Sequence, residues 1–395
     1  MIAQAVAKRV AAALAGLAVA APIAACGGAS SSPHAAAAPI QTPLATSIET
    51  ADGSWATVPM GHLNQPLNTF WQLFVAPPGT TARWSNQVQA TATATNGGIV
   101  LSSGRGRSLI AGVRPSQLLT YSPLIATAND GRSWANGLLP EGLAAHPNAL
   151  AVSPHGQALA LVNNRSGSQV LASTGNLSRW RTLTTEHLLA STASGRACGV
   201  RSITAVAILA GSPTVGASCR EPEAIGIFAH STSGWHAIGP PLPSSVGRGT
   251  VEVLALATRG RQLTSLLSVS GGGATSLVAV WLSSKHRWAI SAPLPMAASE
   301  RLASVGPAGG SGLFALLTEQ SGADRVEVIA GPGHDWRELP PPPPGTETIA
   351  FRTATTADAF AVHNTVLTIS ALSPSPHAWV RTQVMNVSIP FGSSS

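Results

Sequence analysis

Seven tryptophans recur along the chain at nearly even spacing, and each follows the same local pattern. A short apolar run leads into a polar turn rich in Gly, Pro, Ser or Asn, and the tryptophan then opens the next segment. These residues are Trp84, Trp134, Trp180, Trp235, Trp288, Trp336 and Trp379. Their successive separations are 50, 46, 55, 53, 48 and 43 residues, a period typical of units that stack into a larger fold.

Each period holds about four short strand-like runs. Between Trp134 and Trp180, for example, two further apolar runs lie at 149–152 and 158–162. A sheet of four short strands cannot cover both of its own faces, whereas sheets packed radially around an axis cover one another. We therefore predict an all-β fold, a β-propeller of about seven four-stranded blades, with six or eight blades as open alternatives. The 39 glycines and 30 prolines agree with a fold rich in turns.

One copy of the repeat carries a recognisable turn motif in Thr127, Asn129, Gly131, Ser133 and Trp134. It resembles the Asp-box (Ser-x-Asp-x-Gly-x-Thr-Trp) of sialidase-like and other BNR-repeat propellers, and the other six copies match it less closely. The resemblance implies structural roles: the polar side chain caps the turn, the glycine adopts positive φ, and the tryptophan packs between blades. We expect the same anchoring role, and not ligand stacking, for Trp84, Trp180, Trp235, Trp288, Trp336 and Trp379.

The N-terminus has the features of an export signal. Lys8 and Arg9 precede an apolar run at 10–21 that is too short to span a bilayer as a permanent helix. The following Ile23-Ala24-Ala25-Cys26 resembles the lipobox of bacterial lipoproteins, which implies that Cys26 becomes the lipidated first residue of the mature protein. An ordinary secretory signal with an incidental cysteine is the alternative.

The expected organisation follows from this boundary. We predict a lipoprotein signal peptide at 1–25, a lipidated tether rich in Ala, Ser and Pro at 26–50, and a β-propeller domain at 51–395. The expected location is the cell membrane, with the domain lipid-anchored on the extracytoplasmic side.

Two cysteines remain in the mature domain, Cys198 and Cys219. Outside the cytoplasm two such thiols most simply form a disulfide. A metal site is the alternative, because Glu221 and Glu223 follow Cys219 closely, but no histidine lies near either cysteine to complete a familiar ligand set. We therefore expect no metal and no cofactor.

The net charge of +7 does not indicate a nucleic-acid partner. It arises because the chain has only 16 acidic residues, and the arginines are scattered without a basic run. The expected partners are the membrane, through the lipid, and an envelope protein or glycan, and the protein is expected to be a monomer.

The catalytic residues of a sialidase are not apparent. The resemblance would require an arginine trio, an Arg-Ile-Pro motif and a tyrosine nucleophile late in the chain, but Tyr121 is the one tyrosine and precedes the turn motif. We predict a non-catalytic binding or assembly scaffold and nominate no catalytic residue. The alternative is an extracytoplasmic glycoside hydrolase or lyase that uses two carboxylates from predicted blade loops. The candidates are Glu141, Glu186, Glu221, Glu223, Glu252, Glu300 and Glu347.

Overall fold

A computed structural model describes residues 46–51, 53–63, 69–79, 83–87, 98–103, 109–113, 122–129, 131–139, 147–164, 167–246, 248–319, 324–353, 355–373, 375 and 377–387. The chain divides into two units, 1–38 and 39–395, and all described residues belong to the second. The predicted lipidation site Cys26, together with Tyr121 and Glu141, lies outside the described residues.

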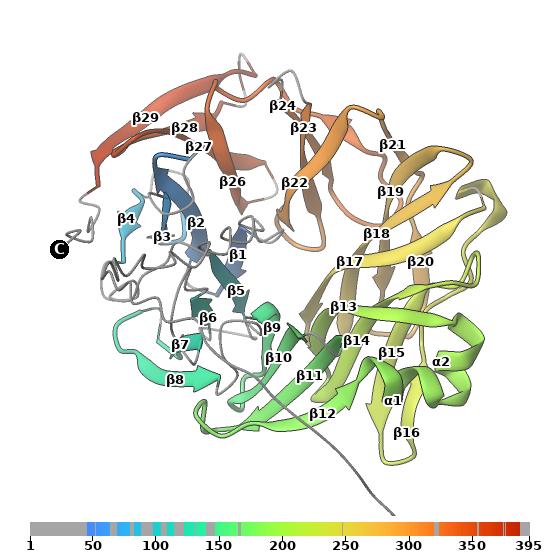
Figure 1. The fold of residues 1–395 in the computed structure, drawn as a ribbon. Helices are drawn as coiled ribbons and strands as arrows, with labels where there is room; N and C mark the ends of the chain where they lie inside the picture. The colour runs from blue at the N-terminus through green and yellow to red at the C-terminus, as the bar shows by residue number, and fades with distance from the viewer. Residues whose placement is uncertain are drawn as a thin grey trace, which may run out of the picture. The chain divides into compact units, whose positions relative to one another are not determined.

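The second unit is built almost entirely of strands, which are grouped here into blades 1 to 7 (Figure 1). Blade 1 contains β1 Ser47–Thr50, β2 Gly53–Gly61, β3 Thr69–Ala76 and β4 Ser85–Asn86, and blade 2 contains β5 Ile99–Ser103, β6 Leu109–Val113, β7 Ser122–Thr127 and β8 Ala135–Leu139. Blade 3 contains β9 Pro147–Val152, β10 Gln157–Asn164, β11 Gly167–Thr174 and β12 Arg181–Thr185. Blade 4 contains β13 Val200–Leu209, β14 Ser212–Cys219, β15 Gly226–Ser231 and β16 Gly234–Ala237. Blade 5 contains β17 Thr250–Arg259, β18 Gln262–Gly271, β19 Ala274–Leu282, β20 Trp288–Ile290 and β21 Leu294–Met296. Blade 6 contains β22 Glu300–Pro307, β23 Leu313–Glu319, β24 Asp324–Ile329 and β25 Arg337–Glu338. Blade 7 contains β26 Thr346–Thr353, β27 Thr356–His363, β28 Val366–Leu372 and β29 Trp379–Asn386.

Within each blade, consecutive strands pair antiparallel in chain order, except that β21 of blade 5 pairs with β19 beside β20. Five blades form separate four-stranded sheets, and blades 4 and 5 share one nine-stranded sheet. A single residue pair, Ser218 with Glu252, joins these two blades, so the sheet resolves into two and the described strands make seven blades. The first strands of neighbouring blades contact one another, which places them innermost (Figure 1). The fold is a seven-bladed β-propeller, as the repeat predicts.

The sequence of each blade follows from its burial. A middle strand is covered by a neighbouring blade on either face, so it reads as a continuous apolar run, as in β19, instead of alternating. The β18–β19 hairpin turns on Gly272 and Gly273, which both adopt positive φ, 60° and 82°. That geometry is the one a two-residue hairpin requires and that glycine adopts without steric cost.

Seven clusters of buried apolar side chains fill the joints between neighbouring blades. Each repeat tryptophan stands at the beginning of its blade's outermost strand and packs into a different cluster. From the joint between blades 1 and 2 onward, the order is Trp134, Trp180, Trp235, Trp288, Trp336, Trp379 and, between blades 7 and 1, Trp84. Because each indole lies between two blades, the spacing of the tryptophans reflects the number of joints.

The joint between blades 7 and 1 brings together the two ends of the domain. The Trp84 indole donates to Asp358 Oδ2 at 2.8 Å, and Arg352 forms an ion pair with the same carboxylate at 2.6 Å. The Gln383 side chain bonds both backbone groups of Trp84, accepting at 3.1 Å and donating at 2.8 Å. No described strand is exchanged between these blades, so side-chain contacts and isolated backbone bonds hold the joint.

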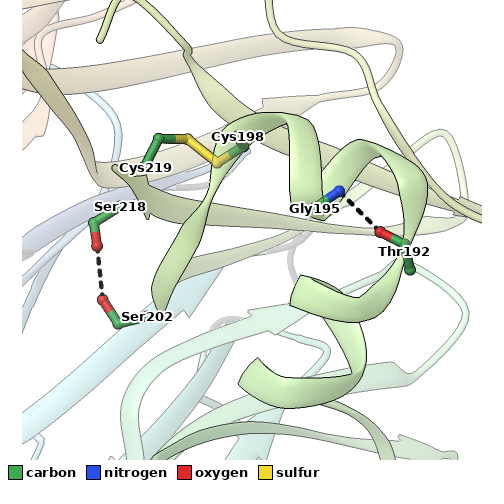
Figure 2. The surroundings of a disulfide bond; sticks show 6 residues. All are labelled: Thr192, Gly195, Cys198, Ser202, Ser218 and Cys219. Carbon is green, nitrogen blue, oxygen red and sulfur yellow. Dashed lines mark hydrogen bonds between the residues drawn. A yellow bond between two sulfur atoms is a disulfide. The ribbon is translucent and has the colours of Figure 1, made fainter. Parts of the chain in front are cut away.

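Two short helices that the sequence analysis did not predict connect blades 3 and 4. Helix α1, Glu186–Ser191, begins after Thr185, and α2, Ala193–Cys198, begins after Thr192; each threonine hydroxyl caps the first turn. Cys198 at the end of α2 forms the predicted disulfide with Cys219 at the end of β14 (Figure 2). The disulfide therefore fastens this helical connection to the first hairpin of blade 4, where Ser202 and Ser218 also share a hydrogen bond.

The sheet begins before the predicted domain boundary at residue 51. Strand β1 occupies 47–50, within the expected tether, and forms the inner strand of blade 1. Strand β2, Gly53–Gly61, is the second strand of that blade and carries Trp55. A 3-10 turn, η3 Ser244–Val246, precedes blade 5.

No helix in the described part of the chain has the length and hydropathy of a membrane span.

Candidate functional site

A channel of about 310 Å³ lies at the centre of the propeller. Its wall comes from the inner strands of six blades, β1, β5, β9, β13, β17 and β22, with Leu313 added from β23. Because each inner strand contributes its own stretch, residues more than 200 positions apart in the chain meet here. A volume near 300 Å³ is at the lower end of those found for small-molecule sites.

The described wall of the channel carries no acidic, basic or histidine side chain. It consists mainly of Ala, Val, Leu and Ile, for example the run Leu254 to Ala257 on β17. The polar side chains are Ser47, Ser102, Ser103, Asn148, Thr204 and Thr258. Such a wall suits an uncharged, largely apolar group.

Several of these polar groups are not available to a ligand. The Thr204 hydroxyl donates to the Val253 carbonyl at 2.6 Å, and the Thr258 hydroxyl donates to the Ile208 carbonyl at 3.0 Å, so both link blades 4 and 5. The Ser47 hydroxyl is buried and has no hydrogen-bond partner among the described residues. The Ser47 hydroxyl lies close to Gly306 of blade 6. A Cβ at position 306 would come within 2.8 Å of the hydroxyl oxygen, so a larger residue there would collide with Ser47.

The candidate carboxylates of the alternative hydrolase or lyase interpretation do not converge on the channel. Of the seven glutamates, the six described ones lie on blades 4 to 7 or the helical connection, and none lines the channel wall. Glu186 accepts from the Ser168 hydroxyl at 3.2 Å, and Glu223 forms an exposed ion pair with Arg248 at 3.2 Å. Glu221 lies in the turn after the disulfide, and burial raises the pKa of Glu252 at the beginning of β17.

Carboxylates gather instead at one side of blade 6. Arg325 forms ion pairs with Glu300 at 2.9 Å and with Glu327 at 2.6 Å. Although burial opposes it, the hydrogen bonds and charge of Arg325 lower the pKa of Glu300. Burial, reinforced by the nearby Asp324, raises the pKa of Glu347. Arg325 neutralises the charge of the two carboxylates that it contacts, so Glu300 and Glu327 form ion pairs within the fold and are not free to act on a substrate.

The turn motif at 127–134 has the geometry expected of a capped turn. The Thr127 hydroxyl accepts from the backbone N–H of Asn129 at 3.2 Å and of Gly131 at 2.9 Å. The Asn129 side chain accepts from the Ser133 N–H at 2.9 Å, and Gly131 adopts φ of 79°. Trp134 meets Trp55 edge to face at 5.9 Å, inside the joint between blades 1 and 2. These side chains are occupied by the fold and face no described recess.

No group of three His, Cys, Asp or Glu residues in the described segments is arranged to hold a metal ion. The nearest candidate from the sequence, the pair of cysteines followed by Glu221 and Glu223, is accounted for by the disulfide.

Comparison with known proteins supports the fold and leaves the activity open. No family model and no curated protein matches the chain. Among solved structures, the BP39L lectin from Burkholderia pseudomallei is similar, with a TM-score of 0.50 at 14% identity over 87% of this chain and 99% of the lectin. A protein from Lactobacillus plantarum is similar with a TM-score of 0.50 at 10% identity, over 86% of this chain and 97% of that protein. At these identities the likeness concerns the fold alone.

Proposed function

We propose that the protein is an exported, lipid-anchored and non-catalytic binding protein of the cell envelope. Its central channel receives an uncharged, apolar side chain or short segment from a protein partner. The observation that carries this proposal is the uncharged wall of the channel, built from the inner strands of six blades. The alternative hydrolase would use two carboxyl groups beside the substrate, and the channel wall offers none among its described residues.

The test separates binding from turnover. The purified protein is incubated with a panel of fluorogenic glycosides, including sialosides, and in parallel with envelope extract for cross-linking. We expect no turnover and capture of a partner by the protein. Turnover that one carboxylate substitution abolishes would contradict the proposal.

A pair of matched variants ties the capture to the channel. Ala257 lines the channel and is exposed, so Ala257→Phe narrows it at little cost to the fold. Ala274 is exposed on the same blade away from the channel, and Ala274→Phe is its control. We expect loss of capture for the first variant and wild-type capture for the second; equal capture by both would rule out the channel as the site.

The anchoring part of the proposal has its own test. Cells expressing the protein are grown with a labelled fatty acid, and the label should appear in the wild type and be absent from Cys26→Ala. Labelling of both forms, or of neither, would contradict lipidation at Cys26. It would not bear on the proposal that the channel binds a partner.

A further inference from the structure

A second recess, of about 320 Å³, lies between blades 5 and 6 and shares no lining residue with the channel. Blade 5 supplies its wall from the ends of β17 and β19 and the beginnings of β18 and β20. Blade 6 supplies Gly310 and Ser311, from the turn between β22 and β23, and Pro332. The recess is therefore formed by hairpin ends and turns at one side of the two blades.

Two indoles line this recess. Trp281, at 3% exposure, donates from its ring nitrogen to the Ser311 carbonyl at 2.7 Å, which ties blade 5 to the turn of blade 6. Trp288 is half-buried and packs into the joint between blades 4 and 5. Both rings are thus held by contacts other than a ligand. Trp281 is buried, so the half-buried Trp288 is the indole with ring surface left to face a ligand.

The recess is positively charged. Arg259 and Arg287 line it and are exposed, while none of its lining residues is acidic. The carboxylate that faces Arg259 is Glu49, which accepts from the Gly309 N–H at 2.9 Å and whose pKa is raised by burial. Within the described residues, no carboxylate forms an ion pair with Arg287.

We propose that this recess binds an acidic saccharide. An indole presents a flat apolar surface to the C–H face of a sugar ring, while a guanidinium binds a carboxylate through two parallel hydrogen bonds. The side chains of Gln262, Thr264 and Ser283 add hydrogen-bonding groups for sugar hydroxyls. The volume is near the lower limit of about 300 Å³ for small-molecule sites, which suits one or two sugar rings.

An acidic peptide fits these observations less well. Extended peptides gain affinity by adding a strand to a free sheet edge. The strand that carries Trp281, β19, is already paired on both edges, with β18 on one side and with β20 and β21 on the other. The outermost strand β20, Trp288–Ile290, leaves one edge free in the described sheet, but its 3 residues offer a peptide few ladder hydrogen bonds. This inference goes beyond the binding of a protein partner in the channel and does not depend on it.

The experiment uses the full-length protein in detergent solution and isothermal titration calorimetry. The probe is tetragalacturonate, and its matched control is the fully methyl-esterified form, which keeps the rings and loses the negative charges. We expect the free acid to bind at least tenfold more tightly than the ester, with an affinity that falls as salt is added. An acidic oligopeptide is titrated beside them.

Matched variants locate the site. Arg287→Gln should weaken binding of tetragalacturonate at least tenfold, and Arg287→Lys should restore part of it. Arg261 is exposed in the turn between β17 and β18 of the same blade but does not line the recess, so Arg261→Gln should bind like the wild type. Both arginines are exposed, and unchanged thermal unfolding of the variants verifies that the fold is intact.

The proposal is overturned by any of four results. These are absence of saccharide binding, equal binding of acid and ester, equal weakening by Arg287→Gln and Arg261→Gln, or binding of the acidic peptide in preference to the saccharide. The channel variant Ala257→Phe should leave saccharide binding unchanged, which keeps this outcome separate from that of the channel.

Discussion

The joint between blades 7 and 1 offers the sharpest test of what closes the propeller. Asp358 is 1% exposed and accepts hydrogen bonds from both Arg352 and the Trp84 indole. Asp358→Asn keeps the shape of the side chain but removes its charge, so the buried Arg352 guanidinium loses the carboxylate with which it forms an ion pair. Removing one partner of a buried ion pair costs about 3–5 kcal/mol, and we expect a loss of this size in the free energy of unfolding.

The assay is urea unfolding followed by tryptophan fluorescence, with Glu223→Gln as control. The Arg248–Glu223 pair is exposed, with side-chain exposures of 86% and 41%, so its loss should cost less than about 1 kcal/mol. The double variant Arg352→Met with Asp358→Leu removes both charges. It should fall within about 1–3 kcal/mol of the wild type, the cost of the buried Trp84 indole N–H left without its acceptor.

The reasoning is refuted if Asp358→Asn costs no more than Glu223→Gln. It is also refuted if the double variant is as unstable as the single one, because the loss would then not come from an unpaired buried charge.

Three further outcomes are expected. Replacing Cys198 and Cys219 together with alanine should cost about 3 kcal/mol, since the disulfide closes a short loop in the unfolded chain; reductant should lower the melting temperature of the wild type and leave that of the variant unchanged. Thr127→Val removes the acceptor of two backbone N–H groups and should cost roughly 1–3 kcal/mol by urea unfolding. Thr382→Val, on an exposed residue of β29, removes only one hydroxyl donor, to the Ile369 carbonyl at 3.2 Å, and should cost less. Burial raises the pKa of Glu347 above its ordinary 4.5, so the folded state binds that proton more tightly than the unfolded state does. The resulting contribution to stability is present below pH 4.5 and is lost as the pH rises through the raised pKa. Glu347→Gln should therefore melt at a higher temperature than the wild type at pH 7 and at the same temperature at pH 4; equal differences at both pH values would contradict this.

The blade architecture could be predicted from the sequence because one bulky residue marks each joint. A buried indole at the beginning of every outer strand leaves a periodic signal even where the surrounding turn has diverged, as at Trp180. The disulfide could be predicted because only two cysteines remain in the domain after Cys26.

The channel and the recess could not be predicted in the same way. Which residues meet at the centre depends on how six inner strands are oriented, and short runs such as Ser47 to Thr50 read as polar linker when seen alone. Arg259 and Arg287 are ordinary scattered charges in the sequence, and the hairpin geometry of blade 5 brings them to one recess. The helical connection had a local signal, a threonine at each helix start, but the strand-rich context concealed it.

Because each blade is made from consecutive residues, the contacts within blades are local in sequence, and one joint is different. The hydrogen bonds from Trp84 to Asp358 and Gln383 span 274 and 299 residues. The entropic cost of closing a chain loop grows only slowly with its length, but long-range contacts slow folding. We therefore expect the blades to form in succession as the polypeptide emerges from its synthesis, and the contact of the first blade with the last to form late.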